Sequence, residues 1–215
     1  MKLQTELYET QTARWPGEGQ HILANYDDDT IVVYQAYRPS IGRFAIENGY
    51  LGGPEFSLSR MSWIKPNFLW MMYRSGWGTK EGQEVTLGLR ISRKFFDEIL
   101  ERAVASSFDP ESNESRENWQ AAVQSSDVRL QWDPDHSPSG AKLARRAVQL
   151  GLRGELLQSF AKAELLEVID LSEFVASQRE NAVGPNFSEL ITPAESIYLP
   201  RSGAAKQRIR ITDPN

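Results

Sequence analysis

Tryptophans and cations crowd into one short segment of the chain, which runs from Arg60 to Trp77. The segment holds three of the six tryptophans together with the cationic side chains of Arg60, Lys65 and Arg74. An arginine can hold a phosphate through two parallel hydrogen bonds, and an indole can stack on a flat ring. The segment therefore predicts a nucleotide pocket whose ligand contacts are Arg60, Trp63, Lys65 and Arg74.

Glutamine side chains interrupt three otherwise apolar runs, at Gln35, Gln131 and Gln149. A buried amide without partners costs about 1–3 kcal/mol, so three of them are explained economically if they line a wet cavity. Each could instead lie on a solvent face or bond a neighbouring strand. On the cavity interpretation Gln35, Gln149 and Asp133 are the candidate catalytic residues, and Tyr37 is a second ring for stacking.

Other kinds of site find little support in the sequence. The chain has two histidines, His21 and His136, and no cysteine, so a zinc site has too few ligands. Asp133 and Asp135 flank Pro134, which is more typical of a turn than of a magnesium site. A phosphate-binding glycine loop and a nucleophile elbow are both missing. We therefore predict no metal.

Composition sets the general class of the protein. Its 215 residues are 40% hydrophobic and 25% charged, which is ordinary for a globular domain. The absence of cysteine fits a reducing compartment, and the first residues lack the apolar core of a signal peptide. The longest apolar run, Phe68 to Tyr73, is far shorter than a membrane span. We expect a cytoplasmic protein without a membrane partner.

Charge alternates along the chain. The net charge of −5 disfavours bulk nonspecific binding to nucleic acid. Yet residues 38–94 carry nine cations against four acids, 136–162 carry five against one, and 201–215 carry four against one. These basic blocks either complement acidic faces elsewhere or converge in space to hold an anion.

Periodicity and breakers outline the secondary structure. The β-branched and aromatic run 30–37 predicts a buried strand, and Pro39 and Gly49 bound a helix over 40–48. A nearly all-apolar helix between Pro66 and Gly76 should be central to the fold. Further strands are expected over 84–91, 128–132, 147–150 and 165–171. Further helices are expected over 93–105, where Ser92 can act as the N-cap, and over 116–123, 154–163 and 172–181.

Strands and helices alternate without a regular βαβ period, which favours an α+β fold. We predict a single compact domain with a mainly antiparallel, split sheet flanked by helices. Its expected bounds are 26–200, with a weakly ordered segment over 1–25 and a basic tail over 201–215.

Four stretches carry a resemblance to a known family. They are 33–37 with Pro39, 60–77 with its dense aromatic and cationic pattern, 128–134, which includes Gln131-Trp132-Asp133-Pro134, and 146–152. On these stretches the chain is identified as a member of the family called domain of unknown function 4291 (DUF4291). The likeness spans about residues 25–175 and implies no activity of its own.

A more distant likeness is to ADP-ribosyltransferase-type folds. There, a strand with an aromatic and a polar residue precedes a helix and a glycine, as Tyr34-Gln35 precedes 40–48 and Gly49 here. That likeness implies a cleft between two small sheets and NAD as the cofactor. Gln35 stands where those folds usually carry arginine or histidine.

Three interpretations therefore stay open. The first is a nucleotide-binding enzyme, a transferase with a nucleotide co-substrate such as NAD. The second is a noncatalytic module for single-stranded RNA or a modified base, with the same aromatics as stacking platforms. The third is that the aromatic cluster belongs only to the hydrophobic core.

Overall fold

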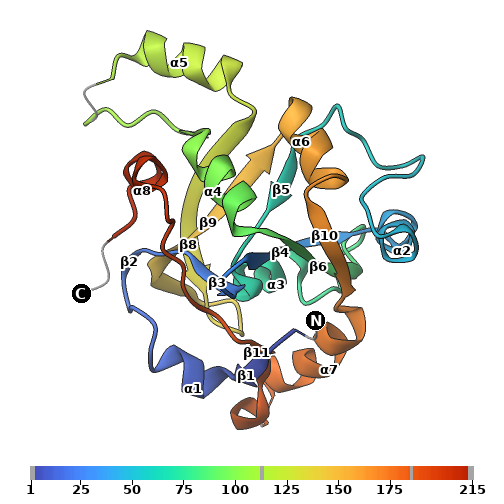
Figure 1. The fold of residues 1–215 in the computed structure, drawn as a ribbon. Coiled ribbons are helices and arrows are strands. Elements are labelled where there is room, and N and C mark those ends of the chain that lie inside the picture. The colour runs from blue at the N-terminus through green and yellow to red at the C-terminus, as the bar shows by residue number, and fades with distance from the viewer. Residues whose placement is uncertain (1–2, 112–113, 185, 213–215) are drawn as a thin grey trace.

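The fold was analysed in a computed structural model, which describes residues 3–111, 114–184 and 186–212. It confirms a compact α+β domain with mainly antiparallel sheets (Figure 1). The helices are α1 (Tyr8–Thr12), α2 (Pro39–Asn48), α3 (Phe68–Ser75), α4 (Arg93–Glu101), α5 (Arg116–Ser125), α6 (Gly154–Ala161), α7 (Ser172–Val183) and α8 (Gly203–Ile209), and a 3-10 turn covers Phe187–Glu189.

Two five-stranded sheets form the frame. The first has antiparallel neighbours throughout, in the order β10 (Leu165–Asp170), β6 (Val85–Ser92), β4 (Thr30–Tyr37), β3 (Leu23–Tyr26) and β12 (Ser196–Ile197). The second has the order β2 (Gly19–Gln20), β9 (Lys142–Leu152), β8 (Val128–His136) and β7 (Ala103–Ala105), with β5 (Ser62–Ile64) also paired to β9. A separate pair joins β1 (Thr5–Leu7) to β11 (Ile191–Pro193).

The short strand β5 connects the two sheets. It runs antiparallel to β9, and the next residue, Lys65, forms a bridge to Tyr34 of β4. The Tyr34 amide donates to the Lys65 carbonyl at 2.7 Å, and the Lys65 amide donates back at 3.2 Å. Residues 62–65 therefore join the two sheets, because they pair first with β9 and then with β4.

Strand β4 is central because both of its faces are buried. Val33 packs into a core cluster that includes residues of both large sheets, whereas Tyr34 packs into a second cluster with α3 and α7. This explains why 30–37 is apolar almost throughout, as a strand covered on both faces requires. On the neighbouring strand β6, Thr86 and Arg90 face away from the first cluster and are nevertheless buried.

Local signals set several helix ends as expected. Pro39 is the first residue of α2, and Gly49 ends it in the left-handed conformation that favours glycine. The Ser92 hydroxyl accepts from the Phe95 amide at 3.1 Å and caps α4. Helix α4 ends at Glu101, earlier than predicted, and the chain then enters β7.

The N-terminal segment, predicted to be weakly ordered over 1–25, has regular secondary structure. Residues 5–26 form strands and a helix, and Gln11 of α1 is fully buried. Its amide donates to Thr192 Oγ1 at 2.9 Å, and its oxygen accepts from the Glu195 amide at 2.7 Å. Contacts across some 180 residues order this segment, and local sequence does not encode them. The extreme ends, 1–2 and 213–215, lie outside the described residues.

Strand β8 continues through Pro134, where the sequence predicts a turn. Pro134 pairs with Arg146 of β9. On the other side of β8, the pairing with β7 ends at Leu130. Beyond Leu130 that edge of β8 is free of a strand partner among the described residues. A proline, which has no N–H, is tolerated at a free edge.

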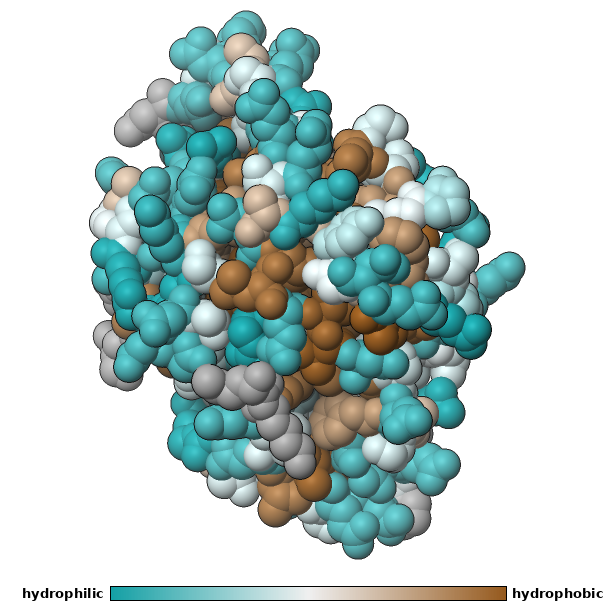
Figure 2. Space-filling view, turned by 45° about the vertical axis from the view of Figure 1, so that its right-hand side comes forward, coloured by the Kyte–Doolittle hydropathy of each residue, from teal (hydrophilic) through white to brown (hydrophobic). Residues whose placement is uncertain are grey.

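The surface is largely hydrophilic. In Figure 2 hydrophobic side chains gather mainly in the middle of the face and hydrophilic ones surround them. Helix α5, which projects at the top of Figure 1, has no buried residue. Within the described residues, no helix combines the length and the apolar character that crossing a membrane requires.

Candidate functional site

The amide of Gln35 fixes the position of β5. Gln35 is buried and donates from Nε2 to Ser62 Oγ at 2.8 Å and to the Trp63 carbonyl at 3.0 Å. The Tyr37 hydroxyl donates to Gln35 Oε1 at 2.9 Å. Burial raises the pKa of Tyr37 to about 12, so this phenol stays a donor at neutral pH. In this structure Gln35 and Tyr37 are bonded to protein groups and brace β5 against β4.

The indole of Trp63 lies across the outer face of β9. Trp63 pairs with Gly151, and a Cβ on that glycine would lie 3.1 Å from Trp63 Cε2 and 2.5 Å from Met61 Sδ. Glycine is therefore needed at 151 to let the ring lie close to the backbone. Trp63 is half-buried and belongs to neither core cluster, unlike Trp77. The core-only interpretation thus does not account for Trp63.

A carboxylate held by two amides lies on the same face of the sheet. Asp133 accepts from Gln131 Nε2 at 2.9 Å and from Gln149 Nε2 at 2.8 Å. Gln131 and Gln149 are opposite each other in the β8–β9 register, and Gln149 shares its face with Gly151 by strand alternation. Two of the three amides that the sequence left unexplained are thus partners of one carboxylate, and Gln131, Asp133 and Gln149 are all half-buried.

Lys65 lies two residues after Trp63 and is close enough to Asp133 for an electrostatic effect. It is buried, and its ammonium has one hydrogen-bond acceptor among the described residues, the Trp63 carbonyl at 3.5 Å. Burial and then the nearby charge of Arg74 lower the pKa of Lys65 to about 8, against an opposing effect of Asp133. In the described part of the chain Lys65 makes no ion pair within 4 Å.

Arg74 and Arg60 are placed differently from Lys65. Arg74 is exposed in the last turn of α3 and is close enough to act electrostatically on Lys65. Arg60 is exposed in the loop before β5, and no contact joins it to the other candidates within the described residues. The structure therefore brings together Trp63, Lys65, Arg74, Asp133 and Gln149, with Gln35 and Tyr37 behind β5. It does not unite them with Arg60.

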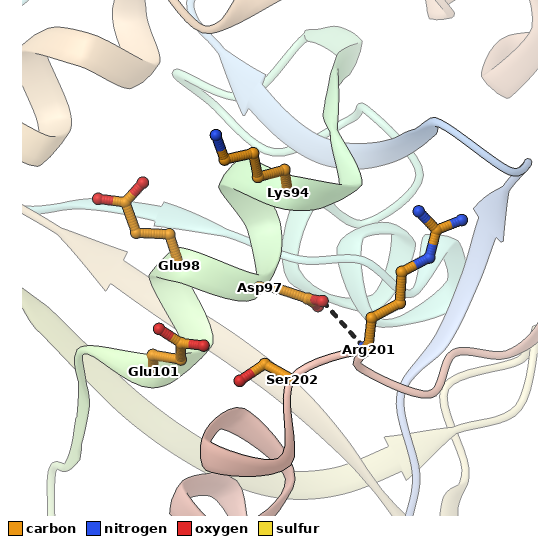
Figure 3. Close-up of a pocket in the computed structure, with 6 residues that line it drawn as sticks. All are labelled: Lys94, Asp97, Glu98, Glu101, Arg201 and Ser202. Atoms are coloured by element: carbon orange, nitrogen blue, oxygen red, sulfur yellow. Dashed lines mark hydrogen bonds between the residues drawn. The ribbon is translucent and has the colours of Figure 1, made fainter.

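Two cavities are present elsewhere on the molecule. One, of about 550 Å³, lies between α4 and the start of α8 (Figure 3). Lys94, Glu98 and Glu101 project from α4 there, and Asp97 accepts a hydrogen bond from the Arg201 amide. The other, of about 560 Å³, lies between the edge of β8, α5 and the end of α8. Trp63, Lys65 and Arg74 line neither of these two cavities.

Two contributors escaped prediction. Ser62 bonds both Gln35 and Tyr37, and the unmet amide of Gln35 was the signal that could have pointed to it. Gln131 was recognised as a polar strand residue, but its pairing opposite Gln149 depends on a register that the sequence does not reveal. In the described part of the chain no group of three or more potential metal ligands occurs.

Comparison with known proteins places the chain in a family. The model for the domain of unknown function (DUF4291) matches residues 21–198, so the chain belongs to that family. This range includes β4, β5, α3, β8 and β9, which carry the whole candidate site. A search of curated proteins found no match.

Proposed function

We propose that the chain binds a nucleotide on the face formed by Trp63, Lys65, Arg74, Asp133 and Gln149. One observation carries the proposal: a buried lysine and an adjacent arginine repel each other, and Lys65 has no carboxylate in contact within the described residues. An anion bound between them would remove the repulsion, and phosphate is the anion that such cations commonly hold.

The ring of Trp63 supports a ligand with a base. Trp63 is half-buried, its backbone carbonyl accepts from Lys65 Nζ at 3.5 Å, and the lack of a Cβ at Gly151 lets its ring lie close to β9. A base stacked on an indole gains about 1–3 kcal/mol. A flat ring on Trp63 with its phosphates on Lys65 and Arg74 is the arrangement of a nucleotide, and the distant likeness to ADP-ribosyltransferase-type folds favours NAD.

As a reaction class we propose group transfer from that nucleotide. In an ADP-ribosyl transfer the bond between ribose C1′ and the nicotinamide nitrogen breaks, and nicotinamide leaves with the bonding electron pair. The acceptor's nucleophilic atom forms the new bond to C1′, and Asp133, held by Gln131 and Gln149, takes the proton that the acceptor loses. Gln35 acts in this scheme as a positioning residue for β5.

The alternative is a noncatalytic module that binds single-stranded RNA or a modified base. It would use the same ring and cations, so binding alone does not separate the two functions. Release of nicotinamide from labelled NAD does, because only a transferase or a hydrolase breaks the glycosidic bond. Binding of NAD without release of nicotinamide, in the presence of protein and RNA acceptors, would favour the module.

Calorimetric titration with NAD and ADP tests the binding site. Replacing Trp63 by leucine is expected to weaken binding about tenfold or more, because the stacking face is removed. Arg74→Ala should weaken it as well, whereas Arg43→Ala, which removes an exposed arginine of α2, should leave the affinity unchanged. A folded wild-type protein that gives no heat with either nucleotide, or equal losses for Arg74→Ala and Arg43→Ala, would refute the proposal.

A further inference from the structure

The second cavity lies on the other side of the β8–β9 sheet from the Trp63 face. Leu130 and Trp132 of β8 and Arg146 of β9 line it, and by strand alternation they point away from Asp133 and Gln149. Gln131, at the free edge of β8, also lines the cavity while it bonds Asp133. The cavity is therefore a separate feature that touches the candidate site only at this edge.

Its walls come from segments far apart in the sequence. One wall is the loop from Ser106 to Pro110 followed by α5, and the other is the end of α8. Figure 1 shows α5 and α8 on the same side of the molecule. An ion pair between Arg210 and Asp109, at 2.5 Å, joins the two walls.

Two tryptophans line the cavity with their ring N–H groups already engaged. Trp119 Nε1 donates to the Ala105 carbonyl at 2.9 Å, and Trp132 Nε1 donates to the Ile209 carbonyl at 3.1 Å. Both indoles are half-buried. Because their donors are used, what they can still offer a ligand is ring surface, which is suited to stacking or apolar contact.

Two arginines at the cavity lack a protein partner. Arg146 and Arg208 are exposed, and neither side chain makes a hydrogen bond or an ion pair with another described residue. Arg146 lies on the face of β9 that further along carries the core residues Val148 and Leu150. Arg146 lies at the cavity because the hydrophobic core ends before this position on β9, and the sheet face is open to solvent there.

The basic blocks 136–162 and 201–215 meet at this cavity. The first supplies Arg146, and the second supplies Arg208 and Arg210. Asp109 and Glu114 also line it, so the titratable lining carries three positive and two negative charges, a net +1 in a chain of net charge −5. With Arg210 paired to Asp109, Arg146 and Arg208 are the cations left for a ligand.

We infer that this cavity binds a phosphorylated nucleoside unit, with its phosphate on Arg146 and Arg208 and its base against Trp119 or Trp132. Aromatic platforms beside cations are how proteins hold single-stranded nucleic acid without reading its sequence. The unit can be a free nucleotide or one residue of a strand. This inference does not depend on the nucleotide proposed for the Trp63 face.

Fluorescence anisotropy with a 5′-labelled oligouridylate tests the inference, with unlabelled UMP and pyrophosphate as competitors. We expect binding whose affinity falls with salt, and the variant Arg146→Glu plus Arg208→Glu should bind at least about tenfold more weakly. Its slope of log affinity against log salt should be shallower by about 0.7 for each phosphate that the variant no longer neutralises. Trp119→Ala should weaken binding at unchanged slope.

The control is Lys206→Glu, which makes the charge change of one of the two substitutions on the exposed side of α8 but outside the cavity. It should leave affinity close to the wild-type value. If UMP binds with the same affinity as the oligonucleotide, the ligand is a free nucleotide. If the oligonucleotide binds much more tightly than UMP, the ligand is a strand. The inference is overturned if neither the oligouridylate nor UMP binds, or if pyrophosphate competes as well as UMP. It is also overturned if Lys206→Glu loses as much affinity as the double variant.

The two nucleotide proposals fail independently. The variant with Arg146 and Arg208 replaced should keep the calorimetric signal for NAD at the Trp63 face. Conversely, Arg74→Ala should keep the oligonucleotide affinity of the cavity. Loss of both signals in a folded Arg146→Glu plus Arg208→Glu variant would mean that a single site accounts for both, which would contradict this inference.

Discussion

Replacing Asp135 by alanine is expected to lower the free energy of unfolding by about 3–5 kcal/mol. Asp135 is almost fully buried, and its Oδ2 accepts from Arg145 Nε at 2.8 Å and from Arg145 Nη2 at 2.6 Å. Arg145 also donates to the Pro16 carbonyl at 2.7 Å and lies over the ring of Trp15. Without Asp135 its guanidinium would stay buried and uncompensated, and the N-terminal segment would lose its anchor on β9.

Chemical denaturation of matched variants measures this effect. Glu55→Ala removes the partner of Arg38 in an exposed ion pair of 3.2 Å and should cost less than about 1 kcal/mol. Replacing both Asp135 and Arg145 by apolar residues of similar size should recover much of the stability, because neither charge is then left buried. A loss for Asp135→Ala no larger than that for Glu55→Ala would show that the buried pair does not hold the fold together.

Replacing Lys65 by methionine is expected to stabilise the protein and weaken nucleotide binding. Burial lowers the pKa of Lys65 from 10.5 to about 8, so at pH 7 the folded protein carries a charge it holds unfavourably. The difference corresponds to a cost on the order of 3 kcal/mol, which Lys65→Met removes. A buried group that lowers stability but is placed to meet a ligand is typical of a functional site.

The pH dependence has a defined sign. Between about pH 8 and 10.5 the unfolded chain binds more protons at Lys65 than the folded chain, so the stability of the wild type should rise through this range. The advantage of Lys65→Met should therefore be largest below pH 8 and vanish above the ordinary lysine pKa. Lys80→Met, at an exposed lysine, should show neither effect. A Lys65→Met variant less stable than the wild type at pH 7 would contradict this assignment.

Nucleotide affinity should change with pH in the opposite direction. Phosphate binding needs the charged form of Lys65, so affinity should fall as pH rises above about 8, with proton uptake on binding in that range. In Lys65→Met this step should disappear and the affinity at pH 7 should be lower. Calorimetry in two buffers of different ionisation enthalpy measures the proton uptake. An unchanged pH profile in Lys65→Met would assign the titration to another group.

Local sequence predicted the elements whose signals are local. The run 30–37 became β4 with the predicted bounds, and Pro39, Gly49 and Ser92 acted at helix ends as expected. The order of the N-terminal segment was not predictable, because it depends on bonds such as that from Gln11 to Thr192. Long-range hydrogen bonds of this kind leave no periodicity in either partner.

The candidate site was predictable in its residue types but not in its geometry. Trp63, Lys65 and Asp133 could be named because aromatic, cationic and acidic side chains stood out among apolar runs. That Asp133 accepts from Gln149, and that Gln35 faces inward to Ser62, depends on strand register. A shift of one residue would have exchanged the faces, and the sequence alone does not exclude that shift.

A crystal structure with bound ADP or NAD tests the central claim most directly, because it locates the phosphates. We predict a phosphate within hydrogen-bond distance of Lys65 Nζ and the Arg74 guanidinium, and a ring stacked on Trp63. A nucleotide bound only in the cavity between α5 and α8, with Lys65 and Arg74 untouched, would contradict the proposed site.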